Sequence, residues 1–154
     1  MTILGIDPGF GRLGWAVVES KGQDLKLIEY GCFETKSGQK IERRLLAVGE
    51  EVGRLVGKYK PDAAGVEDIF YFKNAKTVIN VAQSRGVVIA ELARNDILTK
   101  SFTPLQIKSS VSGHGRADKS QVQNMVKRLL KLESVPKPDD AADACAVAIA
   151  LAFS

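Results

Sequence analysis

Acidic residues stand at the ends of apolar segments in this 154-residue chain. Asp7 follows the apolar residues 3–6, and Glu67 follows the apolar residues 63–66. An ionised carboxylate at the end of a buried strand is costly to desolvate unless a metal, a cation or a hydrogen-bond donor compensates for it. The alternative is structural, because Asp before Pro8-Gly9 often starts a turn, and Asp7 taken alone favours that interpretation slightly. The same pattern at Glu67 indicates a candidate site.

Two further acids, Asp140 and Asp143, lie three residues apart in the final apolar segment and would share one face of a helix. Four carboxylates in one place repel strongly unless divalent cations bind between them. Hard oxygen ligands with retained waters suit Mg²⁺ or Mn²⁺. Two such ions roughly 3.5–4 Å apart would activate a water and stabilise the leaving oxygen in phosphodiester hydrolysis.

The charge distribution also favours a polyanionic partner. The chain has 22 basic and 18 acidic residues, a mild excess that gives a net charge of +4. Acids lie within apolar segments, and bases are concentrated in the second half of the chain. This distribution of charge is similar to that of a nuclease. The bases of that half are Lys73, Lys76, Arg85, Lys108, Arg116, Lys119, Lys127, Arg128 and Lys131. We expect the last three to form a solvated helix face.

Cysteine and hydropathy patterns exclude other classes of protein. Cys32 and Cys145, with the single His114, cannot supply a zinc tetrad, and we expect two buried thiols. The longest apolar run, residues 141–153, is too short to span a bilayer and contains Asp143, and the N-terminus lacks the features of a signal peptide. We therefore expect a soluble, cytoplasmic protein with no membrane partner, formed by one domain over residues 1–154.

The elements that must position the acids follow from hydrophobic periodicity. Residues 3–18 predict a β-hairpin, and residues 25–35 predict a third strand in which Gly31 marks a bulge. Apolar residues recur at helical spacing over residues 41–59, and Pro61 ends that helix. Three antiparallel strands and a helix therefore open the fold.

The middle of the chain continues the alternation of strands and helices. Residues 63–67 form a short apolar strand, and residues 75–95 form a second long helix in which Gly86 allows a close approach. Residues 101–111 predict a further strand. The apolar stripe of the second helix consists of Val78, Val81, Ala82, Val88, Ile89 and Leu92.

Two helices complete the chain. Asp118 and Gln121 form a capping box that opens a helix over residues 119–132 after a flexible loop at residues 113–116. Beyond Pro136 and Pro138, an alanine-rich helix over residues 139–151 is small enough on all sides to sit close against a sheet. The order of elements predicts an α/β arrangement with a mixed sheet, in which the acids opening the last helix face the strand ends.

Five short blocks of the sequence, in chain order, are Gly5-Ile6-Asp7-Pro8-Gly9, Val66-Glu67-Asp68-Ile69-Phe70 with Lys73-Asn74-Ala75, Gln83-Ser84-Arg85-Gly86-Val87, Lys119-Ser120-Gln121-Val122-Gln123 and Asp140-Ala141-Ala142-Asp143-Ala144. Together they resemble the RuvC family of bacterial Holliday junction resolvases, the crossover junction endodeoxyribonucleases. The resemblance covers nearly the whole chain. It implies a ribonuclease H-like α/β fold, with a central mixed five-stranded sheet flanked by helices.

The same resemblance implies the site and its roles. Asp7, Glu67, Asp140 and Asp143 match the metal-binding catalytic acids of the family, with two Mg²⁺ ions expected and Mn²⁺ able to substitute. Lys108 and Lys119 match basic residues near the scissile phosphate, and Lys119 is counted with the catalytic residues. Phe70 matches an aromatic that contacts bases at the junction centre. The complete set of expected DNA-binding residues is Phe70, Lys73, Lys76, Arg85, Lys108, Arg116 and Lys119.

The activity implied is paired, metal-dependent hydrolysis in two strands of like polarity across a four-way DNA junction, in recombination and repair. The resemblance also implies a homodimer that works with the branch-migration proteins RuvA and RuvB. Two departures accompany it. The linker before Asp140 is one residue longer than expected, which places Asp139 beside a catalytic position, and the loop at residues 113–116 carries His114 and Arg116.

Helical spacing leaves the assignment between Asp139 and Asp140 open, because each shares a face with Asp143. Pro138 favours a helix that starts just after it, so we expect Asp139 to be the N-cap and Asp140 to be free for metal. The alternative is that Asp140 caps the helix and the pair with Asp143 is structural.

Three other functions fit parts of the pattern. An actin-like nucleotide-binding domain would use the glycines at positions 9 and 14, although it needs a second domain. A nuclease of the same fold could act on RNA, as in the YqgF group, and a junction-binding protein could lack catalysis.

Overall fold

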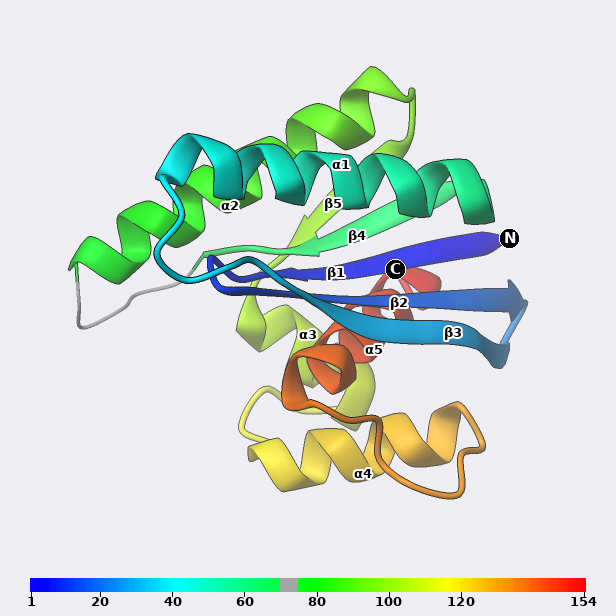
Figure 1. The fold of residues 1–154 in the computed structure, drawn as a ribbon. Coiled ribbons are helices and arrows are strands. Elements are labelled where there is room, and N and C mark those ends of the chain that lie inside the picture. The colour runs from blue at the N-terminus through cyan, green and yellow to red at the C-terminus, as the bar shows by residue number, and fades with distance from the viewer. Residues whose placement is uncertain (70–74) are drawn as a thin grey trace.

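The computed structural model describes residues 1–69 and 75–154, apart from the side chains of Ala75 and Lys76 (Figure 1). Phe70 and Lys73, both expected to contact DNA, lie outside the described residues. Within the described part of the chain, strands and helices alternate as the periodicity predicts, and the sheet is mixed. The predicted α/β class with a ribonuclease H-like arrangement is confirmed.

In the described residues, five strands form one sheet in the order β3-β2-β1-β4-β5. The strands are β1 (Thr2–Pro8), β2 (Arg12–Lys21), β3 (Asp24–Glu34), β4 (Ala63–Glu67) and β5 (Leu98–Phe102). The first three are antiparallel neighbours, whereas β4 runs parallel to β1 and β5 runs parallel to β4. The parallel pairing of β1 and β4 is decisive for function, because it brings their carboxyl ends to the same edge of the sheet.

Helices cover both faces of the sheet (Figure 1). On one face, α1 (Ile41–Tyr59) and α2 (Ala75–Arg94) pack over a core that includes Leu4 and Ile6 of β1. On the other face, α3 (Pro104–Ser112), α4 (Lys119–Leu129) and α5 (Asp139–Ala152) share a core with Ile3. Successive residues of a strand point to opposite faces, so Asp7 follows Ile3 and Gly5 to the α5 side.

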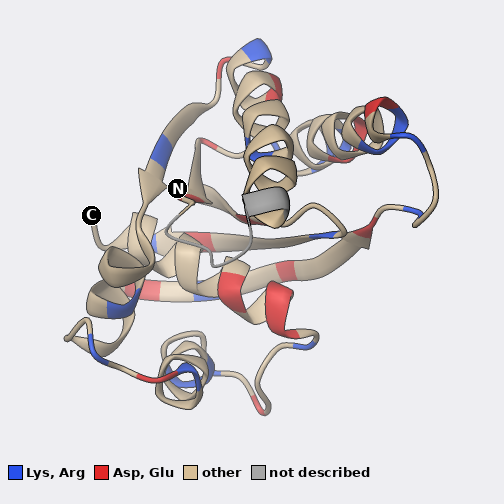
Figure 2. Cartoon of the chain, turned by 90° about the vertical axis from the view of Figure 1, so that its left-hand side faces the viewer, with Lys and Arg blue, Asp and Glu red and all other residues tan. Residues whose placement is uncertain are grey.

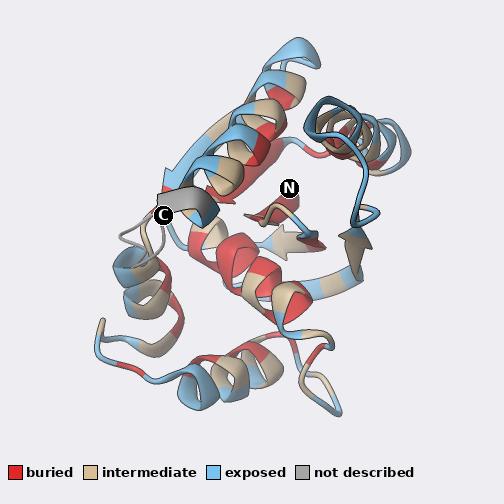
Figure 3. Ribbon diagram, turned by 60° about the vertical axis from the view of Figure 1, so that its left-hand side comes forward, coloured by how far each residue is buried: buried red, intermediate tan, exposed pale blue. Residues whose placement is uncertain are grey.

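Helix α5 lies unusually close to the sheet and is buried along most of its length (Figure 3). A Cβ atom added to Gly5 would lie 2.2 Å from the backbone oxygen of Ala144, and one added to Gly14 would lie 2.0 Å from that of Asp140. Glycines in the strands and alanines in the helix therefore permit backbone contact. The expected close approach of the alanine-rich helix is confirmed.

The predicted strand over residues 101–111 is wrong. Strand β5 ends at Phe102, and α3 begins at Pro104. Thr103 Oγ1 accepts from the Gln106 amide at 3.3 Å, and Gln106 Oε1 accepts from the Thr103 amide at 2.8 Å. This capping box, followed by proline in the first turn, is a helix-start signal that outweighs the β-branched residues around it.

Gly31 and Gly86 have structural roles that differ from those expected. The register shift between β2 and β3 falls at Val17/Val18 rather than at Gly31. Gly31 instead leaves room for the Trp15 indole, because a Cβ atom added there would lie 2.7 Å from the ring. Gly86 faces open space, and the tight approach of α1 to α2 occurs at Gly49, where an added Cβ would lie 3.2 Å from a Val87 methyl. The sequence pattern around a glycine therefore does not indicate which neighbouring atoms pack against it.

Other details differ in a similar way. Ala82, placed in the buried stripe of α2, is exposed, and the buried line runs through Ser84, Val88 and Leu92. The Asp118–Gln121 capping box of α4 is confirmed, although the helix ends at Leu129. Of the two thiols, Cys145 is buried and Cys32 only half-buried.

Among the residues that the structure describes, no helix is long and apolar enough to cross a membrane.

The close contact of α5 with the sheet gives a stability prediction. Gly5→Ala should destabilise the protein by about 1–3 kcal/mol or more, because its Cβ would overlap the α5 backbone. Gly57→Ala on α1 should instead stabilise it by roughly 0.5–1 kcal/mol, because an added Cβ would meet no atom of another described element within 4 Å. Chemical denaturation of both variants measures the difference. A Gly5→Ala variant as stable as wild type would contradict the packing.

Candidate active site

The first pair of acids is brought together by strand register. β1 and β4 are parallel, and Ile6 pairs with Val66, so Asp7 and Glu67 occupy the next position on neighbouring strands. Successive side chains of a strand point to opposite faces, and the preceding residues, Ile6 and Val66, point into the core under α1 and α2. Asp7 and Glu67 therefore both point to the α5 side of the sheet. The two carboxyl groups lie close enough for each to shift the pKa of the other. The juxtaposition predicted from the ends of the apolar segments is present.

The second pair of acids comes from α5. Gly14 lies opposite Asp7 in the β1–β2 register and touches the backbone of Asp140, so the first turn of the helix meets the end of β1. Figure 2 shows the acidic positions at the start of α5. The negative charge of Asp143 acts on both Asp7 and Glu67, and that of Asp140 acts on Asp7. Helix α5 thus adds two carboxylates to the two on the strands.

Burial and mutual repulsion perturb these acids. Burial, followed by the charges of Glu67 and Asp143, raises the pKa of Asp7 well above its ordinary value. Burial also raises the pKa of Glu67 and of Asp143, although the charge of Lys119 opposes the increase at both. No ion pair to Asp7 or Glu67 is present among the described side chains. Within residues 1–69 and 75–154, the cations that form ion pairs with the cluster therefore contact the acids of α5 and not those of the strands.

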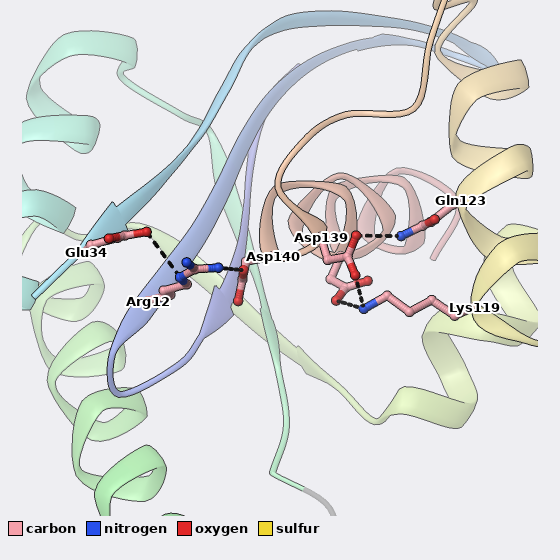
Figure 4. Close-up of polar contacts among 7 residues, drawn as sticks. Arg12, Glu34, Lys119, Gln123, Asp139 and Asp140 are labelled. Atoms are coloured by element: carbon pink, nitrogen blue, oxygen red, sulfur yellow. Dashed lines mark hydrogen bonds and ion pairs between the residues drawn. The ribbon is translucent and has the colours of Figure 1, made fainter.

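Two lysines border the cluster from the helical side. Lys119 opens α4, and its Nζ lies 3.2 Å from Asp139 Oδ2 and 3.4 Å from Asp143 Oδ2 (Figure 4). The charge of Lys108 on α3, like that of Lys119, opposes the increase that burial causes in the pKa of Glu67. Both lysines border a cavity of about 230 Å³ beside the acids. The lining is Glu67, Pro104, Ile107, Lys108, Lys119, Val122, Asp143 and Ala146, a charged rim above an apolar floor.

The expected N-cap role of Asp139 is wrong. The cap position is Pro138, no side chain caps the helix, and α5 starts at Asp139. The Asp139 carboxylate instead accepts from Gln123 Nε2 at 3.3 Å and pairs with Lys119, whose hydrogen bond lowers the pKa of Asp139 (Figure 4). Asp139 is therefore an ion-pair partner of Lys119. This role depends on the tertiary contact between α4 and α5.

The alternative in which Asp140 caps the helix is also wrong. Asp140 Oδ2 lies 3.8 Å from Arg12 Nη1, and Arg12 Nε lies 3.1 Å from Glu34 Oε1 (Figure 4). Arg12 and Glu34 were not among the residues predicted for the site. The available signal was their position, because they face each other at the start of β2 and the end of β3.

The donor set fits a divalent metal, although it is not arranged around one. Among the described residues, no three His, Cys, Asp or Glu side chains converge closely enough to hold an ion as they stand. Asp7 and Glu67 lie side by side at the strand ends, while Lys119 and Arg12 form ion pairs with the acids of α5. Carboxylate oxygens are the ligands that Mg²⁺ and Mn²⁺ prefer, and a cation would relieve the repulsion that raises the pKa of Asp7.

The remaining predicted DNA contacts are dispersed. Arg116 and His114 are exposed in the loop between α3 and α4. Lys76 lies in the first turn of α2, although its side chain lies outside the described residues. Arg85 is largely buried and already bound to protein acceptors, including Glu67 O at 3.2 Å. Of the lysines and arginines predicted to bind DNA, Lys108 and Lys119 therefore border the acids, whereas the others that the structure describes occupy separate positions.

Comparison with known proteins identifies relatives along the whole chain. A family model described as crossover junction endodeoxyribonuclease RuvC matches residues 3–151. The protein of that name from Petrotoga mobilis is 48% identical over 148 residues, which cover 96% of this chain and 91% of the relative. The one from Clostridioides difficile is 48% identical over 154 residues, covering 100% of this chain and 91% of the relative.

Solved structures agree with the sequence matches. The structure of T. thermophilus RuvC in complex with Holliday junction substrate superposes with a TM-score of 0.94 at 30% identity, covering 99% of this chain and 93% of the other. The yeast mitochondrial Holliday junction resolvase Ydc2 has a TM-score of 0.72 at 13% identity, with 98% and 77% covered, and shares the fold. These matches favour the DNA endonuclease over the nucleotide-binding and RNA-cleaving alternatives.

The raised pKa of Asp7 predicts that this acid destabilises the metal-free fold. A carboxyl with a raised folded-state pKa binds its proton more tightly in the folded chain, so the destabilisation is absent below the unfolded value near 3.8 and develops as pH rises. Asp7→Asn should therefore raise the melting temperature in EDTA at pH 7 by a few degrees, and the gain should shrink towards pH 4. The exposed Glu133→Gln variant is the control. A lower melting temperature for Asp7→Asn at pH 7 would contradict this account.

Proposed function

The chain belongs to the RuvC family of crossover junction endodeoxyribonucleases, and from that premise we propose that it resolves four-way (Holliday) DNA junctions by metal-dependent phosphodiester hydrolysis in two strands of like polarity. The observation that carries the proposal is the meeting of Asp7 and Glu67 with the acids of α5 at one sheet edge. Such an enzyme would act in recombination and repair, in the cytoplasm where bacterial DNA lies.

We propose Asp7, Glu67, Asp140 and Asp143 as the ligands of two Mg²⁺ ions, with Mn²⁺ able to substitute. When bound, such ions activate a water and stabilise the leaving oxygen. The chain's own contribution is placement. Asp7 and Glu67 are fixed by the sheet register, and the acids of α5 are fixed by a helix in backbone contact with that sheet. Ligands on rigid elements need little reorganisation when substrate arrives.

Lys119 and Lys108 are proposed to stabilise negative charge on the reacting phosphate. Both border the cavity that also contains Glu67 and Asp143, so a phosphate beside the acids would lie within reach of both ammonium groups. Lys119 also opens α4, where free backbone amides favour anions. The ion pairs of Lys119 with Asp139 and Asp143 hold it at the site before DNA binds.

The wider DNA interface is proposed from the family resemblance. Phe70 would stack on unpaired bases at the junction centre, a contact worth about 1–3 kcal/mol per base. Lys73, Lys76 and Arg116 would meet phosphates, which supply most of the affinity for DNA. Arg116 is exposed and available for such a contact.

We further propose that the active species is a homodimer. One chain has one cluster of acids on the described residues and so can cut one strand, whereas paired nicks across a symmetrical junction need two copies. A two-fold dimer matches the symmetry of the substrate. The branch-migration proteins RuvA and RuvB are proposed as partners on the basis of the family.

The acids should be required for cleavage and dispensable for binding. Asp7→Asn, Glu67→Gln and Asp140→Asn should abolish Mg²⁺-dependent nicking of a synthetic four-way junction, because each removes a proposed metal ligand. Affinity for the junction, measured by gel shift in EDTA, should remain close to that of wild type. Asp139→Asn is the matched control and should still cleave, since Asp139 pairs with Lys119. An active Asp140→Asn beside an inactive Asp139→Asn would reverse the two assignments.

The effect of a lysine substitution on the cleavage rate should depend on the distance of that lysine from the acids. Lys119→Ala should lower the cleavage rate at saturating protein by about 10²–10³-fold, as loss of a transition-state charge contact does. Lys131→Ala should leave that rate unchanged, because Lys131 Nζ is bound 2.6 Å from Asp24 Oδ1 at the β2–β3 end. Single-turnover kinetics on a four-way junction compare the two. Equal losses would mean that both lysines are general phosphate contacts.

A further inference from the structure

Consecutive residues of α2, Ser84 and Arg85, reach the two strand ends that carry Asp7 and Glu67. Ser84 is the one polar side chain that is fully buried among the described residues. Its hydroxyl donates to Gly9 O at 3.0 Å. Gly9 in turn donates its amide to Asp7 O at 3.1 Å. The serine therefore fixes the turn that directly follows Asp7.

Arg85 makes the corresponding contacts at the other strand end. Its Nε donates to Glu67 O at 3.2 Å, and its Nη2 donates to Ser101 Oγ at 2.7 Å. The same Nη2 lies 3.2 Å from Asp68 Oδ1. The guanidinium side chain is only 19% exposed. It thus joins the end of β4 to β5, where the Asp68 amide also donates to Phe102 O at 2.8 Å.

Helix geometry explains why adjacent residues can serve two strands. Successive side chains on an α-helix diverge by about 100°. Ser84 and Arg85 can therefore point from one turn of α2 to the ends of β1 and β4, which are neighbours in the sheet. Both interactions are made to backbone carbonyls, so they fix the path of the strands and leave the two carboxylates free.

We infer that Ser84 and Arg85 are positioning residues that hold the ends of β1 and β4 at a fixed separation and so set the spacing between the Asp7 and Glu67 carboxylates. This inference rests on the proposed role of those two acids as metal ligands. It replaces the direct DNA contact that was predicted for Arg85 from the sequence. Metal sites need ligands held within about 0.5 Å of the productive geometry, and two carboxylates without a cation repel each other.

The chemistry of arginine is specific to this task. Its planar guanidinium offers several N–H donors in a rigid fork, whereas the lysine ammonium is a compact charge on a flexible stem. Arg85 uses this fork on a backbone carbonyl of β4, the carboxylate of the residue after β4, and a hydroxyl of β5. Arg85→Lys should therefore preserve the charge and lose most of the positioning.

The Mg²⁺ dependence of junction cleavage tests the inference. Arg85→Lys, Arg85→Gln and Ser84→Ala should each raise the Mg²⁺ concentration for half-maximal cleavage, by about 10–100-fold for Arg85, as loss of an outer contact to a metal ligand does. Junction affinity in EDTA should stay close to wild type. Arg54→Ala is the control, because Arg54 also pairs with an acid, Glu51, but lies on α1. Weaker junction binding with an unchanged Mg²⁺ dependence would overturn the inference and make Arg85 a DNA contact.

Amide hydrogen exchange provides a measure that needs no catalysis. In EDTA, exchange at residues 9–11 should rise in Ser84→Ala, and exchange at residues 67–69 should rise in the Arg85 variants, with little change in Arg54→Ala. Unchanged exchange in folded variants would refute the positioning role. If Arg85→Gln fails to fold, Arg85→Lys carries the comparison. An inactive wild type would instead refute the proposed function, and the exchange data would still decide whether these residues hold the strand ends.

Discussion

The parallel pairing of β1 with β4 is the constraint on which the site depends. It aligns Ile6 with Val66 and so forces the next residues, Asp7 and Glu67, to share one edge and one face of the sheet. Two carboxylates placed in this way lose hydration and repel each other. The surrounding structure must therefore hold them by other means, through the buried β1 and β4 backbones and the helices packed on them.

The second constraint is the small size of the side chains where the first half of α5 meets the sheet. Gly5, Gly14 and Gly65 lie on the face that α5 covers, and each leaves room for an atom of that helix. The helix contributes alanines at the same contact, so two backbones meet where most α/β layers meet through larger side chains. Acids at the start of such a helix have little freedom to move away from the strand ends. The same small residues thus determine how closely α5 packs on the sheet and where the acids of α5 lie.

The sequence was sufficient for the parts of the fold that local patterns determine. The helix at residues 41–59, the strand at residues 63–67 and the Asp118–Gln121 capping box are all present, because each depends on periodicity or on neighbours a few residues away. The strand predicted over residues 101–111 is wrong because the Thr103–Gln106 capping box and Pro104 start a helix there. The four acids could be selected from strand ends and helical spacing, with family resemblance to support the choice.

What could not be predicted depends on contacts between distant segments. Asp139 is a good cap by local rules, yet Lys119 and Gln123 of α4 bind its carboxylate. Arg85 was predicted to contact DNA, and only the fold shows that it also binds groups of β4 and β5. Charge type can be read from a sequence, whereas the partner that neutralises a charge is set by topology.

The ion pairs of Lys119 have a consequence for which anions can reach it. Asp139 and Asp143 belong to the same chain, so they compete for the ammonium as tethered ligands, whose effective concentration is at least in the millimolar range. A free phosphate or nucleotide present at lower concentration would rarely displace them. If Lys119 meets the reacting phosphate as proposed, a DNA strand already held along its backbone would deliver that phosphate at a comparable local concentration. The two ion pairs should then favour anchored polymers over small diffusing anions, and they would form again when the DNA leaves.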